Sequence, residues 1–284
     1  MNEEMKTRRK RLIVICILVM LFAAGLVICE SDFMGKDDTS AIQYLEVYSA
    51  FLPLLVYIVP FGLVLRWLGR KYDVKGWELL LSVFCGALIP AALAGQINGG
   101  FDDLMKSLLG HSYSEDWLGS AEAGVVEEVL KLAAAALLLY VLQRRALKDY
   151  LLIGMSVGLG FQIEEDLSYI TESGFEKTSD AFPSALDRVS CCFGSHWAYA
   201  AVTAAGLYLI IRSGSRNHRR RGILWILFVM ADHSLYDTPI ADSLLFNALL
   251  QAAIVMPVIL FFTSPKMKTE KSRNFQGIPA IKKE

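Results

Sequence analysis

Several common signatures of soluble enzymes are missing from this sequence. It has five cysteines, none in a CxxC spacing, and no HExxH motif, so it encodes neither a cysteine-based metal site nor the usual helical zinc motif. It also lacks a glycine-rich phosphate loop, an obvious serine or cysteine nucleophile, a surface patch suited to nucleic acid and an internal repeat. We therefore expect the cysteines to pack as small apolar side chains, and no nucleic acid as a partner.

What the sequence has instead is apolar length. Hydrophobic residues make up 54% of the 284 residues, the mean hydropathy is +0.42, and apolar runs near 20 residues recur over most of the chain. Such runs are long enough to cross about 30 Å of hydrocarbon as helices. The sequence predicts an all-α polytopic membrane protein with about eight spans, near residues 12–29, 45–65, 78–95, 120–142, 149–170, 190–211, 222–238 and 242–263.

The connections between these runs alternate in charge. Basic residues cluster at 6–11, 66–77, 144–148, 212–221 and 266–283, whereas 30–44, 96–119 and 171–189 are net acidic. Basic loops stay in the cytoplasm, so both termini are predicted inside. We expect one transmembrane domain over residues 1–264 and a disordered, cytoplasmic polar tail over 265–284. Within 96–119, residues 101–108 have helical periodicity and predict a short interfacial helix.

Three ionisable residues interrupt the fourth predicted span. Glu127, Glu128 and Lys131 lie within one apolar helical pattern, where each charge costs roughly 2.5–3.5 kcal/mol on insertion scales. Glu127 and Lys131 have i,i+4 spacing and could form a purely structural ion pair between helices. The functional interpretation is a site facing protein or water, with partners on other spans.

Candidate partners occur at a similar depth in the next three spans. Counting 1.5 Å per residue from the outer end of each span places Glu165, His196 and His233 roughly 5–9 Å below the outer surface, close to the level of the glutamates. Each alone has a bland interpretation, such as an interior histidine with a hydrogen bond. Their shared depth predicts one centre built by spans four to seven, residues 120–238.

Carboxylates and imidazoles at one point suit the activation of water. A buried carboxylate beside a histidine can take a proton from water, and two histidines with a carboxylate can hold Zn²⁺ with an open position. Both arrangements favour hydrolysis of an amide bond at the membrane, and the sequence leaves metal-dependent and metal-free mechanisms open.

The order and spacing of these residues resemble a known family. Glu127-Glu128-Val129-Leu130-Lys131 resembles the EExxK motif of the PrsW family of intramembrane proteases, and residues 158–166 are similar to its GxGFxxxEN motif. His196 opens the next span, and the stretch from His233 to Asp237 resembles the closing HxxxN. The resemblance covers roughly residues 45–263.

The resemblance implies an endopeptidase of the bacterial plasma membrane that cleaves a single-span protein, such as an anti-sigma factor. Glu127 or Glu128 would be the general base, and Glu165, His196 and His233 would orient water or bind zinc or another divalent metal. Lys131, Phe161, Asp166 and Asp237 would support them.

The sequence departs from the family pattern at Asp166 and Asp237, where the family has asparagine. An ionised aspartate cannot donate a hydrogen bond to a developing oxyanion. These departures favour one alternative, a non-catalytic, immunity-type protein of the same fold. A CAAX-type prenyl-protein endopeptidase is a second alternative. An ion-coupled transporter is a third, since buried glutamates and histidines also build ion relays, although no inverted repeat supports it.

Overall fold

The computed structural model describes residues 3–35, 38–110, 113–212, 214–265 and 267, which form helices and turns without a strand. The longer helices are α1 (Glu3–Asp32), α2 (Ala41–Ser49), α3 (Leu55–Tyr72), α4 (Gly76–Gly86), α5 (Ala92–Leu109), α6 (Ser120–Val141), α7 (Leu147–Glu176), α8 (Ala181–Ser190), α9 (His196–Arg212), α10 (Arg216–Tyr236) and α11 (Leu244–Thr263). The all-α prediction is confirmed. The predicted tail, except residues 265 and 267, lies outside the described residues.

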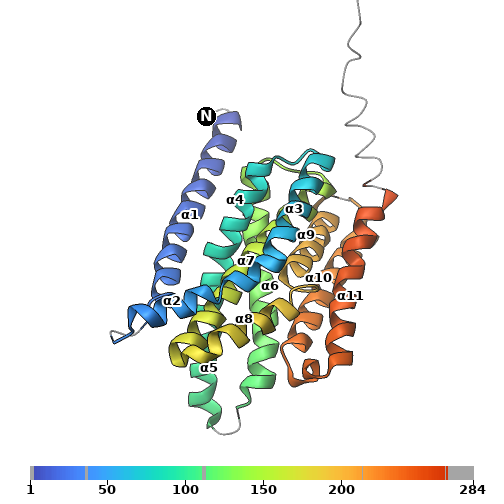
Figure 1. Cartoon of the computed structure of the whole chain (residues 1–284). Coiled ribbons are helices and arrows are strands. Elements are labelled where there is room, and N and C mark those ends of the chain that lie inside the picture. The colour runs from blue at the N-terminus through green and yellow to red at the C-terminus, as the bar shows by residue number, and fades with distance from the viewer. Residues whose placement is uncertain (1–2, 36–37, 111–112, 213, 266, 268–284) are drawn as a thin grey trace, which may run out of the picture.

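The helix α7 forms the centre of the bundle. Every residue from 147 to 162 is buried, and α7 packs against α4, α6, α8 and α9. The helices α1 and α11 lie at opposite edges, and the short α8 crosses one end (Figure 1). A helix buried on all sides needs no polar face, which explains why residues 150–161 are apolar around the whole circumference except at Ser156.

Glycines let α7 approach its neighbours closely. A Cβ on Gly158 would lie 2.1 Å from the carbonyl oxygen of His196, and one on Gly160 would lie 1.9 Å from that of Val83. No side chain fits at either distance, so the glycines bring α7 against α9 on one side and α4 on the other. The close packing at Gly158 fixes the position of His196.

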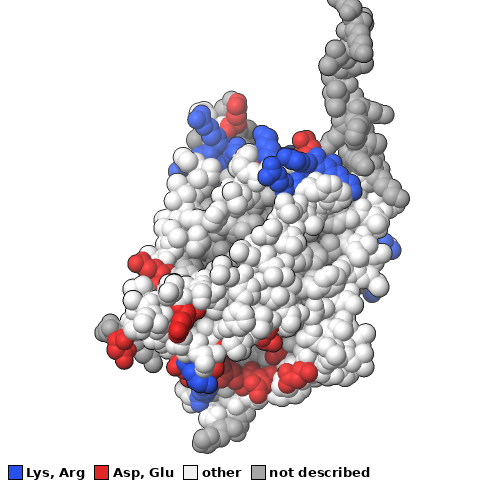
Figure 2. Space-filling view, in the orientation of Figure 1, with Lys and Arg blue, Asp and Glu red and all other residues white. Residues whose placement is uncertain are grey.

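Four segments of the described chain have the length and hydropathy of a membrane span: Glu4–Ser31, Ala41–Tyr72, Gly76–Leu109 and Leu244–Thr263. The helices α6, α7 and α10 carry charged residues within their apolar stretches, and α9 has only 17 residues, so hydropathy alone does not mark them. The eight spans and the inward termini remain predictions. Lysines and arginines gather at one end of the molecule, and acidic residues at the other (Figure 2).

Two predicted boundaries were wrong. The span predicted over 190–211 is divided, because α8 ends at Ser190 and α9 begins only at His196. His196 therefore opens its helix instead of lying about 9 Å along it. The segment 101–108 is the last part of α5 and not a separate interfacial helix.

Replacing Gly160 by alanine should destabilise the bundle, because the new methyl group would meet the Val83 carbonyl at 1.9 Å. We expect a loss of about 1–3 kcal/mol, measured as a lower melting temperature of the purified protein in detergent. Gly95→Ala on α5 is the matched control, since a Cβ there meets nothing within 4 Å. Equal melting temperatures of the two variants would contradict the close contact.

Candidate active site

The helix α6 carries three ionisable side chains into the interior of the bundle. Glu127, Glu128 and Lys131 are at most 6% exposed. The Lys131 Nζ atom lies 2.6 Å from Glu128 Oε1 and 3.6 Å from Glu127 Oε2, so its closer partner is three residues away and not four. Asn98 of α5 donates a hydrogen bond of 3.2 Å to Glu127 Oε1. The cation offsets part of the cost of burying two carboxylates.

The last turn of α10 places His233 against both glutamates. Its Nδ1 atom lies 3.1 Å from Glu128 Oε1, and its Nε2 atom lies 3.6 Å from Glu127 Oε2. The ring of Tyr199 stacks on the imidazole with 4.6 Å between ring centroids. Contacts on both the edge and the face of the ring fix its orientation.

His196 lies between a cation and a carboxylate. Lys131 Nζ donates to His196 Nδ1 at 2.8 Å, so the ring proton is on Nε2 and is donated to Glu165 Oε2 at 2.9 Å. The ring of Phe161 covers this pair, with Lys131 Nζ 4.1 Å from its centroid and the His196 ring centroid at 4.8 Å. Phe161 thus supplies a cation–π interaction to the buried ammonium.

Arg188, on α8, joins the site although sequence reasoning did not single it out. Its guanidinium forms ion pairs with Glu165 and, at 2.5 Å, with Asp166 Oδ1. Glu165 is thereby held between Arg188 and His196. One signal in the sequence could have identified Arg188. It lies in the net acidic segment 171–189, whereas the other arginines lie in the basic segments. Asn98 and Tyr199, also unpredicted, had no such signal.

The two aspartates that depart from the family pattern have different environments. Asp166 accepts hydrogen bonds from Arg188 Nε and, at 2.6 Å, from the Tyr57 hydroxyl, and it does not line the site cavity. Aspartate has a negative charge at this position, where asparagine would be neutral, and Arg188 balances that charge. Asp237 lines the cavity, and its Oδ2 atom lies 3.4 Å from His233 Nε2, where it can orient that imidazole.

Glu127, His196 and His233 form a group able to hold a metal ion, because one donor atom from each lies within 4.8 Å of the others. All three are buried, and Glu127 Oε2 has no hydrogen-bond partner among the described residues. Two imidazoles and a carboxylate are a usual donor set for catalytic zinc. The predicted set had Glu165 in place of Glu127, whereas the structure places Glu165 on His196 Nε2.

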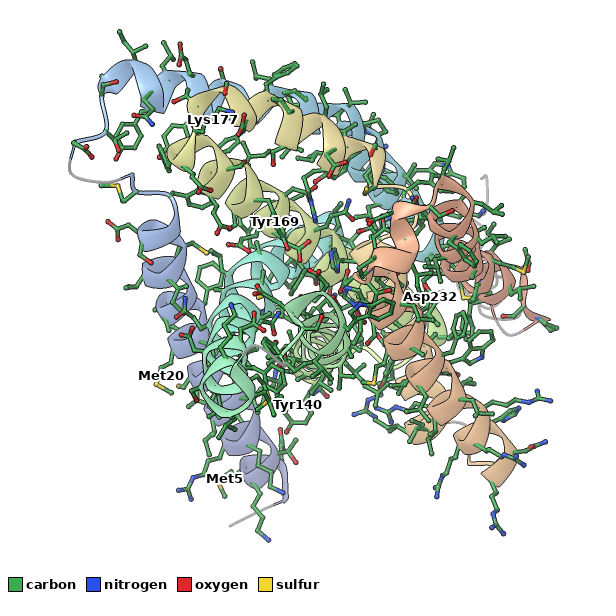
Figure 3. The ribbon with its side chains drawn as sticks, turned by 90° about the horizontal axis from the view of Figure 1, so that it is seen from below. Met5, Met20, Tyr140, Tyr169, Lys177 and Asp232 are labelled. Atoms are coloured by element: carbon green, nitrogen blue, oxygen red, sulfur yellow. The ribbon has the colours of Figure 1, made fainter. Side chains whose placement is uncertain are left out.

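A cavity of about 490 Å³ gives access to this group from the acidic end of the molecule. Its wall includes Glu127, Glu165, His196, His233 and Asp237, but not Glu128 or Lys131. Figure 3 views this end from below and shows side-chain nitrogen and oxygen atoms crowded between Tyr169, on α7, and Asp232, on α10. The predicted residues therefore meet around one space open to solvent.

A helical bundle with carboxylates and imidazoles around a polar cavity is the arrangement expected of a membrane-embedded hydrolase. The model of the PrsW family, described as intramembrane metalloproteases, matches residues 75–263, and the chain belongs to this family. The match begins in α4 and leaves α1 to α3 outside it, a narrower range than the predicted 45–263. Searches of curated proteins and of solved structures found no match.

Replacing Arg188 by glutamine should destabilise the protein, because Glu165 and Asp166 would lose their shared cation. We expect a loss of about 3–5 kcal/mol, seen as a lower melting temperature in detergent. Adding Asp166→Asn to this variant should recover part of the lost stability, because it removes one of the two unpaired negative charges.

The control for this prediction is Lys177→Gln, which removes an ion pair to Asp180 that is largely exposed and should leave the melting temperature unchanged. The role assigned to Arg188 would be refuted if Arg188→Gln melted like the wild type, or if Asp166→Asn gave no recovery in the double variant.

Proposed function

We propose that this protein is an intramembrane endopeptidase that cleaves a membrane-anchored, single-span protein near the outer face of the bacterial plasma membrane. An anti-sigma factor is the type of substrate that the family suggests. The observation that carries the proposal is the meeting of Glu127, His196 and His233 at a cavity that opens at the acidic end. Basic residues gather at the opposite end of the molecule, which supports an orientation with that end in the cytoplasm and the cavity at the outer face.

The donor group assigns separate roles to the two adjacent glutamates. Glu127 lines the cavity and, with His196 and His233, would hold the metal ion. His196 would bind through Nδ1, its one ring nitrogen without a proton, and the metal would there take the place of the hydrogen bond from Lys131 Nζ. Glu128 is fully buried between Lys131 and His233 and has no access to the cavity, so it positions the histidine and does not meet substrate. A zinc ion held there would supply a bound water with a pKa of about 7 and a Lewis acid for the substrate carbonyl.

The protein groups around the donors would orient them and move protons. Glu165 accepts the Nε2 proton of His196 and, with Asp237, is a cavity-lining carboxylate outside the donor group. These two carboxylates are placed to take a proton from the attacking water and return it to the leaving amine. Lys131 keeps the local charge from becoming strongly negative. In a metal-free mechanism, Glu127 would be the general base.

Single replacements should separate catalysis from folding. We expect Glu127→Gln and His233→Ala to lower cleavage at least about a hundredfold, the usual scale for a lost general base or metal ligand, while both proteins still reach the membrane. The measurement is proteomics of membrane peptides from cells expressing each variant, with abundance checked by immunoblot.

Glu172→Gln is the matched control for Glu127→Gln, since Glu172 is an exposed residue of α7 that does not line the cavity. The control should leave cleavage unchanged. If Glu127→Gln and His233→Ala gave the same membrane peptides as the wild type at equal abundance, a non-catalytic role would replace the protease proposal.

Metal removal provides an independent test. We expect one zinc or other divalent ion per purified chain, lost on treatment with 1,10-phenanthroline together with cleavage, and both restored by added metal. His196→Ala and Glu127→Gln should each lower the metal content measured by mass spectrometry, whereas Glu172→Gln should not. A metal-free wild type whose cleavage survives the chelator would favour Glu127 as general base.

A further inference from the structure

A second cavity, of about 590 Å³, lies between α3, α4 and α7 and shares no lining residue with the active-site cavity. Aliphatic side chains and two glycines form most of its wall: Ile58, Gly62, Leu65, Val74, Gly76, Leu79, Leu80, Val83, Leu159 and Ile163. Its volume is within the range of small-ligand sites. The wall suits an acyl chain, because it offers aliphatic contact and no acidic side chain.

Two arginines complete the lining of this cavity. Arg66 and Arg70 lie one helical turn apart on α3, so their side chains project from the same face. Both are exposed, and neither belongs to an ion pair found among the described residues. An apolar cavity with two cations at its edge is complementary to a ligand that has an apolar chain and an anionic head.

Two acidic groups of the neighbouring helices are already engaged, while Asp73, which ends α3, is exposed to solvent. Glu78, at the start of α4, forms an ion pair with Arg144, and Asp149 of α7 lies 3.7 Å from Arg144 Nη1. Arg144 therefore takes up the negative charge next to the cavity. Arg66 and Arg70 form no ion pair within the described part of the chain, so an anionic ligand can supply their counter-charge.

The position of the cavity indicates the source of that charge. Arg66 and Arg70 lie in the last two turns of α3 and belong to the basic segment 66–77, which the charge pattern predicts to face the cytoplasm. The cytoplasmic leaflet is rich in anionic lipids, and basic pockets between membrane helices on this side bind their head groups. The helices α3 and α4 are parts of candidate spans, so the cavity lies beside lipid.

We propose that this cavity binds one anionic phospholipid, with its phosphate on Arg66 and Arg70 and an acyl chain between α3, α4 and α7. The lipid would fill the space beside Leu159 and Ile163, which are on the same helix as Glu165. A zwitterionic lipid lacks the net charge that the two arginines require.

The test is native mass spectrometry of the full chain in mixed micelles containing dioleoylphosphatidylglycerol or dioleoylphosphatidylcholine, which have the same acyl chains. We expect one phosphatidylglycerol to be retained, and Arg66→Gln/Arg70→Gln to weaken its binding roughly tenfold, to the level of phosphatidylcholine. The matched control is Arg219→Gln/Arg220→Gln, which removes two exposed cations from α10 at the same end.

A second variant tests the apolar half of the cavity. Gly62→Leu should reduce phosphatidylglycerol binding while leaving both arginines in place, because Gly62 lines the cavity and a Cβ there meets nothing within 4 Å. This variant keeps the test valid if the arginine variant fails to fold.

Three results would overturn the proposal. The first is equal retention of phosphatidylglycerol and phosphatidylcholine. The second is an equal loss of phosphatidylglycerol binding in the Arg66/Arg70 and the Arg219/Arg220 variants. The third is displacement of the lipid by a single-span peptide, which would assign the cavity to a protein partner. Lipid retention is measured without cleavage, so its failure leaves the protease proposal standing.

Discussion

The buried ammonium of Lys131 is the interaction on which the site depends. It has no exposed surface, and it contacts Glu127, Glu128 and His196 at once. In a medium of low dielectric constant, two adjacent carboxylates without a cation would repel each other and protonate. With Lys131 present, Glu128 can accept from His233 while Glu127 faces the cavity. The division of roles between the two glutamates follows from the position of this single charge.

Much of the site could be predicted from the sequence, because insertion into a membrane limits where charge is tolerated. Glu127, Glu165, His196 and His233 were expected at one depth from span counting alone, and the structure brings them around one cavity. Their common depth in the membrane stays a prediction, and His196 begins its helix instead of lying within it. Helical rise along a span is local geometry, and it needs no knowledge of how the helices pack.

The remaining features depend on tertiary contacts that periodicity does not encode. Arg188 reaches Glu165 and Asp166 only because α8 folds back across the end of α7, and Asn98 reaches Glu127 only because α5 runs on past the predicted span. The same contacts account for Asp166, whose charge conflicts with the family pattern until Arg188 and Tyr57 are placed beside it. The sequence also could not predict which of the two glutamates faces the cavity, because that depends on how α6 packs against its neighbours.

The separation of Glu128 from His233 by 105 residues has a consequence for how the protein is made. When α6 leaves the ribosome, α7, α9 and α10 have not yet been synthesised. Only Lys131, one turn away on the same helix, can then neutralise Glu128. The early membrane intermediate therefore holds an incompletely balanced helix until α7, α9 and α10 are synthesised. The order of translation makes α10 the element that completes the group of Glu127, His196 and His233, and a chain truncated before it would keep α1 to α9 but lack His233.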